Sequence, residues 1–378
     1  MFNKEKRTSN FELLRIIAII LIVMQHLAYY SKFDHNSMSF FDNTYIYIVE
    51  IFGKLGVFLF VVITGYFYEK NKSNIKKYVF FDVKILTYSL LCLIFAVIVN
   101  INKISNENII KTFFPCCFGL YWFATCYLLL IIFAPYLNII IEKLDEIEYR
   151  KFLIILFIII SIIAYIPKTE VYFNNLFMFI FIYLIGAYIK KYDVSLGSNI
   201  LRKTLIVLLF FSIVIAILFM VMSYKVTIVS NYLMFPFYLN SPLIVFLGIT
   251  VFLIFKNLKI NSDFVNVVSK NTFGIYLIHE NLLVRDIIWN YFFNLSNYTG
   301  IKLIIFSIIK IFIIMVGCIL ISFLVDNVLL KKINIVIEKI LNRMKFIYDS
   351  YIKKIIRDKK NSISNRIKYN WKEFERWK

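Results

Sequence analysis

The chain has 378 residues, of which 61% are hydrophobic and 19% aromatic, and it carries a formal net charge of +20. Soluble domains contain roughly 45–50% apolar residues, so this composition excludes an ordinary soluble enzyme, a disordered chain and a disulfide-framework protein. The remaining class is an all-α polytopic membrane protein, in which an excess of Lys and Arg usually marks cytoplasmic loops rather than nucleic-acid binding.

Ten apolar runs approach the length of a membrane span. A hydrocarbon core about 30 Å thick requires roughly 20 mostly apolar helical residues. The first run follows three basic residues but is long and lacks a cleavage site of small residues, so we interpret it as a retained span. The ten predicted spans cover residues 11–30, 45–68, 78–100, 120–141, 152–166, 172–189, 204–224, 231–255, 272–293 and 303–324.

The distribution of charge in the loops gives the expected orientation. Lys and Arg should accumulate on the cytoplasmic side if no span has been missed. The segments placed inside carry 17 Lys or Arg residues and the outer loops carry six. This predicts an integral protein of the cytoplasmic (plasma) membrane with both the N-terminus and the C-terminus inside.

The last 48 residues differ from the rest, because they contain 15 Lys or Arg residues between apolar residues at helical spacing. We therefore expect two parts, a membrane-embedded domain over residues 1–330 and a basic amphipathic cytoplasmic tail over residues 331–378. Such a helix can lie on the anionic inner leaflet. A solvated tail that anchors the orientation and a partner-binding segment both remain open as its role.

Polar residues in the first predicted span are candidates for function, because charged side chains are costly within a bilayer. Arg15 and His26 are eleven residues apart, about 16 Å along a helix, and can lie on one face. Arginine binds phosphate bidentately, and an imidazole can take a proton from a hydroxyl. The structural alternative is that Arg15 pairs with Glu12 and that His26 is a packed interfacial residue.

The ninth predicted span contains His279, Glu280 and Asn281 in succession, and these three cannot all face lipid. Adjacent helical positions point about 100° apart, so Glu280 is expected to serve a partner other than His279, such as Arg15 or Lys310. A polar cluster that only holds the helices together is the alternative.

Other charged residues in the spans receive structural interpretations. Glu50 and Lys54 are four residues apart and are expected to form an ion pair. Arg285 and Asp286 lie near the outer end of a predicted span, where water can solvate them. No metal is expected, because the five Cys and three His residues show no ligand spacing.

Four stretches resemble the acyltransferase 3 family of integral membrane acyltransferases. The first runs from Asn10 to Ala18 and is followed by His26, which gives the Arg and His of the family's first helix. The others are residues 56–66, an apolar Phe-rich segment ending in Thr-Gly-Tyr, residues 120–135, a Trp-Phe helix ending in Pro, and residues 273–281, a Gly-x-Tyr-Leu-x-His segment. Thr64 stands where Ser is common, which preserves the hydroxyl.

The resemblance implies ten spans, a cytoplasmic acyl-CoA donor, and transfer of an acyl group, most often acetyl, to a hydroxyl of a surface carbohydrate or lipid-linked glycan. It implies donor binding by Arg15 and an essential catalytic role for His26, and we expect His279 and Glu280 to complete the site. Direct base catalysis and a transient acyl-histidine both remain open. The competing functions are a glycan polymerase, a lipid-linked sugar flippase or another transporter of the surface-polysaccharide pathway.

Overall fold

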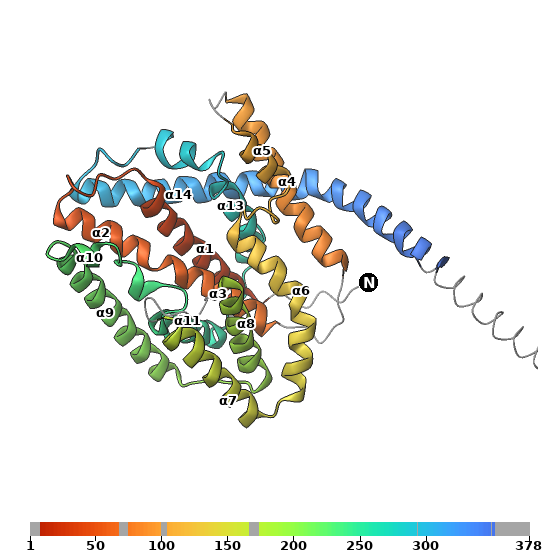
Figure 1. Ribbon diagram of the computed structural model, residues 1–378, viewed down its shortest axis with the longest axis horizontal. Helices are drawn as coiled ribbons and strands as arrows, with labels where there is room; N and C mark the ends of the chain where they lie inside the picture. The colour runs from red at the N-terminus through yellow and green to blue at the C-terminus, as the bar shows by residue number, and fades with distance from the viewer. Residues whose placement is uncertain are drawn as a thin grey trace, which may run out of the picture.

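The computed structural model describes residues 8–67, 75–99, 104–165, 174–292, 294–348 and 350–351 (Figure 1). All regular secondary structure in these ranges is helical, which confirms the predicted all-α class. In chain order the elements are α1 (Ser9–Tyr30), α2 (Phe40–Ile51), α3 (Gly53–Tyr66), α4 (Ile75–Ile98), α5 (Asn106–Phe113), α6 (Trp122–Lys143), α7 (Glu146–Phe157), η1 (Ile158–Ile163), α8 (Asn175–Lys191), α9 (Ser198–Ser223), α10 (Thr227–Ser230), η2 (Phe235–Phe237), α11 (Pro242–Asn257), α12 (Asp263–Ser269), α13 (Thr272–His279), η3 (Ile287–Tyr291), α14 (Gly300–Leu324) and η4 (Val325–Leu330).

Seven helices in the described ranges are long and apolar enough to cross a membrane. They are Ser9–Tyr30, Phe40–Tyr66, Ile75–Ile98, Trp122–Lys143, Ser198–Ser223, Ile228–Asn257 and Gly300–Tyr348. Each corresponds to one of the ten spans predicted from the sequence. The total of ten and the cytoplasmic location of both termini therefore remain predictions.

The other three predicted spans have a different structure. The fifth coincides with α7 and η1, whose first turns carry Glu146, Glu148 and Arg150. The sixth coincides with α8, which has 17 residues. The ninth is not one continuous helix, because α13 ends at His279 and helical structure resumes only near η3. This break places the polar residues that follow α13 in a turn.

The centre of the molecule is built from α1, α3 and α8, which pack closely through small residues. A Cβ atom at Gly65 of α3 would overlap the backbone of Tyr183 in α8, and one at Gly186 of α8 would overlap the backbone of Val62. Gly56 makes the same close approach to the backbone of α1. Small residues at helix crossings increase van der Waals contact, which drives association where the surroundings are as apolar as the helices.

Apolar side chains cover the outside of the bundle. Over their most apolar windows, the span Phe40–Tyr66 is 72% buried, whereas Ser198–Ser223 is only 17% buried and Gly300–Tyr348 only 22%. The exposed residues of these outer helices are mainly Ile, Leu, Val and Phe. An exposed apolar surface of this kind is the arrangement expected of a protein surrounded by lipid.

The predicted tail begins within a helix. Helical structure continues without a break from Gly300 through Tyr348, so no loop separates α14 from the basic segment. In Figure 1 this helix passes along the bundle and projects beyond it. The ion pair between Lys76 and Glu338, 3.1 Å long, ties the projecting part to the start of α4. Residues 352–378 of the tail lie outside the described residues.

Candidate active site

Helix α1 carries the candidate residues along its length and borders two cavities. Ser262 and Ser9 fix its start through a backbone-to-hydroxyl hydrogen bond of 3.0 Å, and its last residue, Tyr30, reaches the segment after α13. Arg15 lines one cavity of about 530 Å³, which we call the Arg15 cavity. His26 lines another of about 640 Å³, which we call the His26 cavity. The candidate site is therefore built around α1, with one cavity at Arg15 and a second cavity at His26.

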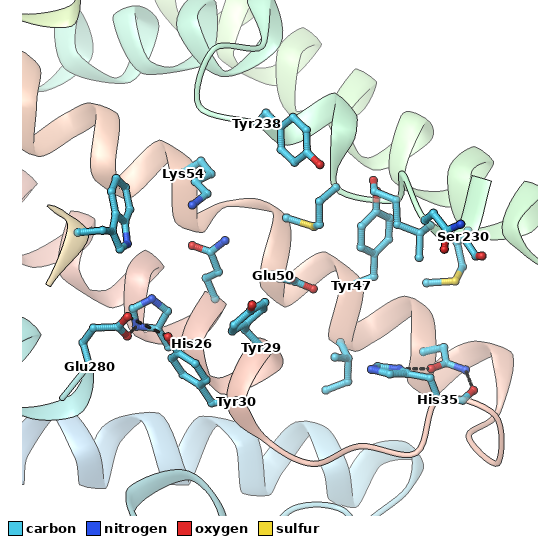
Figure 2. Close-up of a pocket in the computed structure, with 18 residues that line it drawn as sticks. His26, Tyr29, Tyr30, His35, Tyr47, Glu50, Lys54, Ser230, Tyr238 and Glu280 are labelled. Carbon is cyan, nitrogen blue, oxygen red and sulfur yellow. Dashed lines mark hydrogen bonds and ion pairs between the residues drawn. The ribbon is translucent and has the colours of Figure 1, made fainter. Parts of the chain in front are cut away.

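The structure brings His26, His279 and Glu280 together. Nδ1 of His26 lies 2.9 Å from Nε2 of His279. The same nitrogen lies 3.2 Å from Oε2 of Glu280 (Figure 2). His279 has no exposed surface, and His26 and Glu280 are also buried. Because α13 ends at His279, the turn that follows directs Glu280 toward His26 of α1.

The hydrogen bonds assign the ring protons of the two histidines. Nδ1 of His279 lies 2.6 Å from the carbonyl oxygen of Ile275, which can only accept, so this nitrogen carries the proton. In a neutral ring, Nε2 of His279 is then an acceptor, and His26 donates to it from Nδ1. Nε2 of His26 is left as the unprotonated nitrogen, and it has no hydrogen-bond partner among the described residues.

Tyr30 holds Glu280 from its other side, and Arg285 packs against Tyr30. The hydroxyl of Tyr30 donates to Oε1 of Glu280 at 2.8 Å, and the guanidinium carbon of Arg285 lies 4.7 Å from the Tyr30 ring centroid. Oε2 of Glu280 accepts no well-formed hydrogen bond, although it is close to His26. One carboxylate oxygen is thus fixed in place, and the second lies close to Nδ1 of His26.

The segment after α13 is supported by buried polar contacts. The indole of Trp289 donates to the carbonyl oxygen of His279 at 3.3 Å, and Lys310 donates to the carbonyl oxygen of Trp289 at 2.6 Å. Asn281 donates to the hydroxyl of Tyr121 at 2.6 Å. Lys310 therefore supports the turn rather than pairing with Glu280. The contacts of Trp289 and Lys310 give hydrogen-bond partners to two backbone carbonyl groups in and after the break.

The Arg15 cavity is rich in positive charge. Arg15 donates to Oε1 of Glu12 at 2.5 Å, so the predicted structural alternative of an ion pair does form. The guanidinium has further N–H donors, and the same cavity is lined by Lys77, Lys84 and Lys270. Four cationic side chains facing one acidic side chain create a site suited to an anionic ligand.

The His26 cavity has a different character. Its charged lining residues are Glu50, Lys54 and Glu280, and its walls include several tyrosine rings (Figure 2). The predicted ion pair between Glu50 and Lys54 is wrong for this structure. The helix is interrupted at Phe52 between α2 and α3, and the Lys54 ammonium instead lies 5.0 Å from the Trp122 ring centroid.

Only a few side chains separate the Arg15 cavity from the His26 cavity. Trp122 lines the His26 cavity and its neighbour Phe123 lines the Arg15 cavity. Glu280 and Tyr276, one helical turn apart, divide between the cavities in the same way, and the Tyr276 ring is 6.3 Å from the His279 ring. A small number of aromatic side chains thus stand between the cationic cavity and the histidine pair.

Two parts of this site are absent from the expectations drawn from the sequence. Tyr30 follows His26 by four residues, a spacing that places both on one face of α1 and could have indicated their common partner. The cavity lining by Glu50 and Lys54 depends on the kink at Phe52, for which the sequence gives only the following Gly53 as a signal.

Comparison with known proteins gives a family. The model of the acyltransferase 3 family, described as an acyltransferase domain, matches residues 8–326, which is most of the chain. No curated protein and no solved structure matches significantly. The match covers all four stretches that carry the resemblance and includes Arg15, His26, His279 and Glu280. The protein therefore belongs to the acyltransferase 3 family and is a membrane acyltransferase.

Proposed function

We propose that this protein is an O-acyltransferase that moves an acyl group, most simply acetyl, from cytoplasmic acyl-CoA to a hydroxyl of a cell-surface or lipid-linked carbohydrate. The observation that carries the proposal is the buried cluster of His26, His279 and Glu280. This cluster lies beside the His26 cavity, and the same helix α1 also borders the cationic Arg15 cavity. Acyl transfer to a hydroxyl requires a base, an anion site for the phosphates of the donor, and room for the acceptor.

Arg15 binds the donor phosphates in this proposal. Its cavity carries the charge that a polyphosphate ligand requires, with Lys77, Lys84 and Lys270 around the guanidinium. The Arg15 cavity then opens to the cytoplasm, in agreement with the orientation that the charged loops predict. The acyl end of the donor reaches past Phe123 and Tyr276 toward His26.

His26 is the general base. Its unprotonated Nε2 takes the proton of the acceptor hydroxyl while the hydroxyl oxygen forms a bond to the acyl carbon. Collapse of the tetrahedral intermediate breaks the carbon–sulfur bond, and the proton on His26 passes to the departing CoA sulfur. The products are the acylated acceptor and free CoA, and His26 returns to its starting form.

Glu280 and His279 orient and stabilise His26. His279 fixes the ring of His26 by accepting from its Nδ1, and the Glu280 carboxylate, 3.2 Å from the same nitrogen, stabilises the imidazolium formed during transfer. This division of roles is that of a base with an orienting acid, which recurs on unrelated folds.

The O-acetyl content of surface polysaccharide, measured by proton NMR, tests the proposal in cells. Cells lacking the protein should lose acetyl signal, and only the wild-type protein, not His26→Ala, should restore it. Unchanged acetylation together with altered polysaccharide length or amount would instead identify a polymerase or flippase. An unchanged polysaccharide in every respect would exclude surface polysaccharide as the acceptor.

A further inference from the structure

Two opposite charges in the His26 cavity have no function in the mechanism above. Glu50 lies in the last turn of α2 and Lys54 in the first turn of α3, on either side of the kink at Phe52. Neither side chain makes a hydrogen bond or an ion pair to any residue that the structure describes. Figure 2 shows both on the wall of the cavity that contains His26 and Glu280.

This placement is costly unless a ligand uses it. Glu50 and Lys54 lie within a helix pair long and apolar enough to span the membrane, and both are half-buried. Ionisable residues within spans are expensive and usually face a cavity that has a function. A simple ion pair would reduce the cost, but the two side chains do not form one, and the Lys54 ammonium lies over the Trp122 ring instead.

The surrounding walls indicate the chemistry of the ligand. Aromatic rings of Tyr29, Tyr47, Trp122 and Tyr238 line the same cavity. Ring faces carry partial negative charge and can pack against the C–H groups of a sugar ring. A carboxylate accepts hydrogen bonds only, and an ammonium donates only, so together they can bind neighbouring hydroxyl groups. A volume of about 640 Å³ is within the range of a ligand-binding pocket.

We propose that Glu50 and Lys54 form an acceptor subsite in the His26 cavity for a polyhydroxylated ligand, such as a sugar. Glu50 accepts hydrogen bonds from the ligand's hydroxyl groups, and Lys54 donates to its oxygen atoms. The subsite rests on the proposed function in one respect, since it places one remaining hydroxyl near Nε2 of His26. In this proposal, Glu50 and Lys54, on either side of the interruption at Phe52, determine which acceptor the protein binds.

The test compares Glu50→Gln and Lys54→Gln, which remove charge but keep size, with a matched control pair. Glu142→Gln and Lys143→Gln serve as controls, because both residues are exposed at the end of α6 and line neither cavity. The acceptor is glycan isolated from cells that lack the protein and is therefore unacylated by it. Membranes carrying each variant receive labelled acetyl-CoA, and initial rates are measured against glycan concentration.

Each subsite variant should raise the KM for glycan about ten- to a hundredfold, as expected for the loss of a hydrogen bond to a charged group. The loss should fall on this KM more than on kcat, and the KM for acetyl-CoA should stay within about twofold. Glu50→Asp and Lys54→Arg, which retain the charges, should recover part of the affinity and show that the fold is intact. A wild-type KM in both Gln variants would overturn the subsite while leaving the proposed function standing.

A binding measurement separates the two proposals. Purified wild-type protein should be stabilised against heat by the glycan without acetyl-CoA, and the Gln variants should not. If this pattern holds but no wild-type transfer occurs, the subsite stands and the acyltransfer proposal fails. Stabilisation only by phosphorylated glycan, lost in Lys54→Gln but kept in Glu50→Gln, would overturn the polyhydroxyl assignment in favour of an anionic ligand. No stabilisation and no transfer would overturn both.

Discussion

Replacing Glu280 with Gln tests the role of the carboxylate beside His26. Gln keeps an oxygen that can accept from Tyr30, but it removes the negative charge 3.2 Å from Nδ1 of His26. A hydrogen bond between charged groups is worth about 1.5–3 kcal/mol. If that energy is realised only when His26 is protonated, kcat should fall about ten- to a hundredfold.

The Glu280→Gln substitution should not lower the thermal stability of the folded protein. Glu280 is buried, and its Oε2 accepts no well-formed hydrogen bond. The charge of Glu280 therefore destabilises the folded protein, although catalysis requires that charge. The melting temperature of Glu280→Gln should therefore equal or exceed that of the wild type. A lower kcat together with equal or greater stability would be difficult to explain by a purely structural role.

The assay measures transfer of labelled acetyl from acetyl-CoA to isolated glycan, with membranes adjusted to equal amounts of folded protein. Tyr30→Phe is the matched comparison, because it removes the hydroxyl that donates to Glu280 but leaves the carboxylate. Its cost should be only a few-fold, since one hydrogen bond between protein groups contributes about 0.5–1.5 kcal/mol. A wild-type kcat in Glu280→Gln, or a larger loss in Tyr30→Phe than in Glu280→Gln, would show that the charge of Glu280 does not assist His26.

Three further predictions address the donor cavity and the packing. Arg15→Ala should raise the KM for acetyl-CoA about ten- to a hundredfold with a smaller effect on kcat, and an unchanged KM would remove Arg15 from donor binding. Asp326→Asn should free Lys84, whose ammonium is 2.6 Å from that carboxylate, so the KM for acetyl-CoA should fall and become more salt-dependent; a raised KM would contradict this. Gly186→Ala should lower the free energy of unfolding by about 1–3 kcal/mol, whereas Gly317→Ala should not, because Gly317 faces open space. Equal melting temperatures for these two variants would contradict the close packing of α3 and α8.

The sequence predicted the long apolar helices well, because length and hydropathy alone decide them. The first span was expected over residues 11–30 and is observed as Ser9–Tyr30. The shorter α8 and the charged start of α7 are harder to assign, since neither satisfies the length and charge of a simple span. Their interpretation depends on packing against the rest of the bundle, which a single sequence does not display.

The site was predictable by residue but not by geometry. Arg15, His26, His279 and Glu280 stand out as polar residues in apolar runs, and the structure places the last three in contact. Their arrangement depends on the end of α13 at His279, and no Pro or Gly in residues 279–286 signals that break. The expectation of an ion pair between Glu50 and Lys54 was wrong because the i, i+4 rule presupposes an unbroken helix, and this helix is interrupted at Phe52.

Reconstitution of the purified protein into liposomes with labelled acetyl-CoA and glycan shows whether the protein alone transfers acetyl to the glycan through His26. Wild-type protein should transfer label to the glycan in an ester linkage that mild base releases. His26→Gln, compared at equal amounts of folded protein, should lose about a hundredfold or more of the rate, as expected for removal of a general base. Equal ester formation by the wild type and a stably folded His26→Gln variant would show that His26 is not the general base.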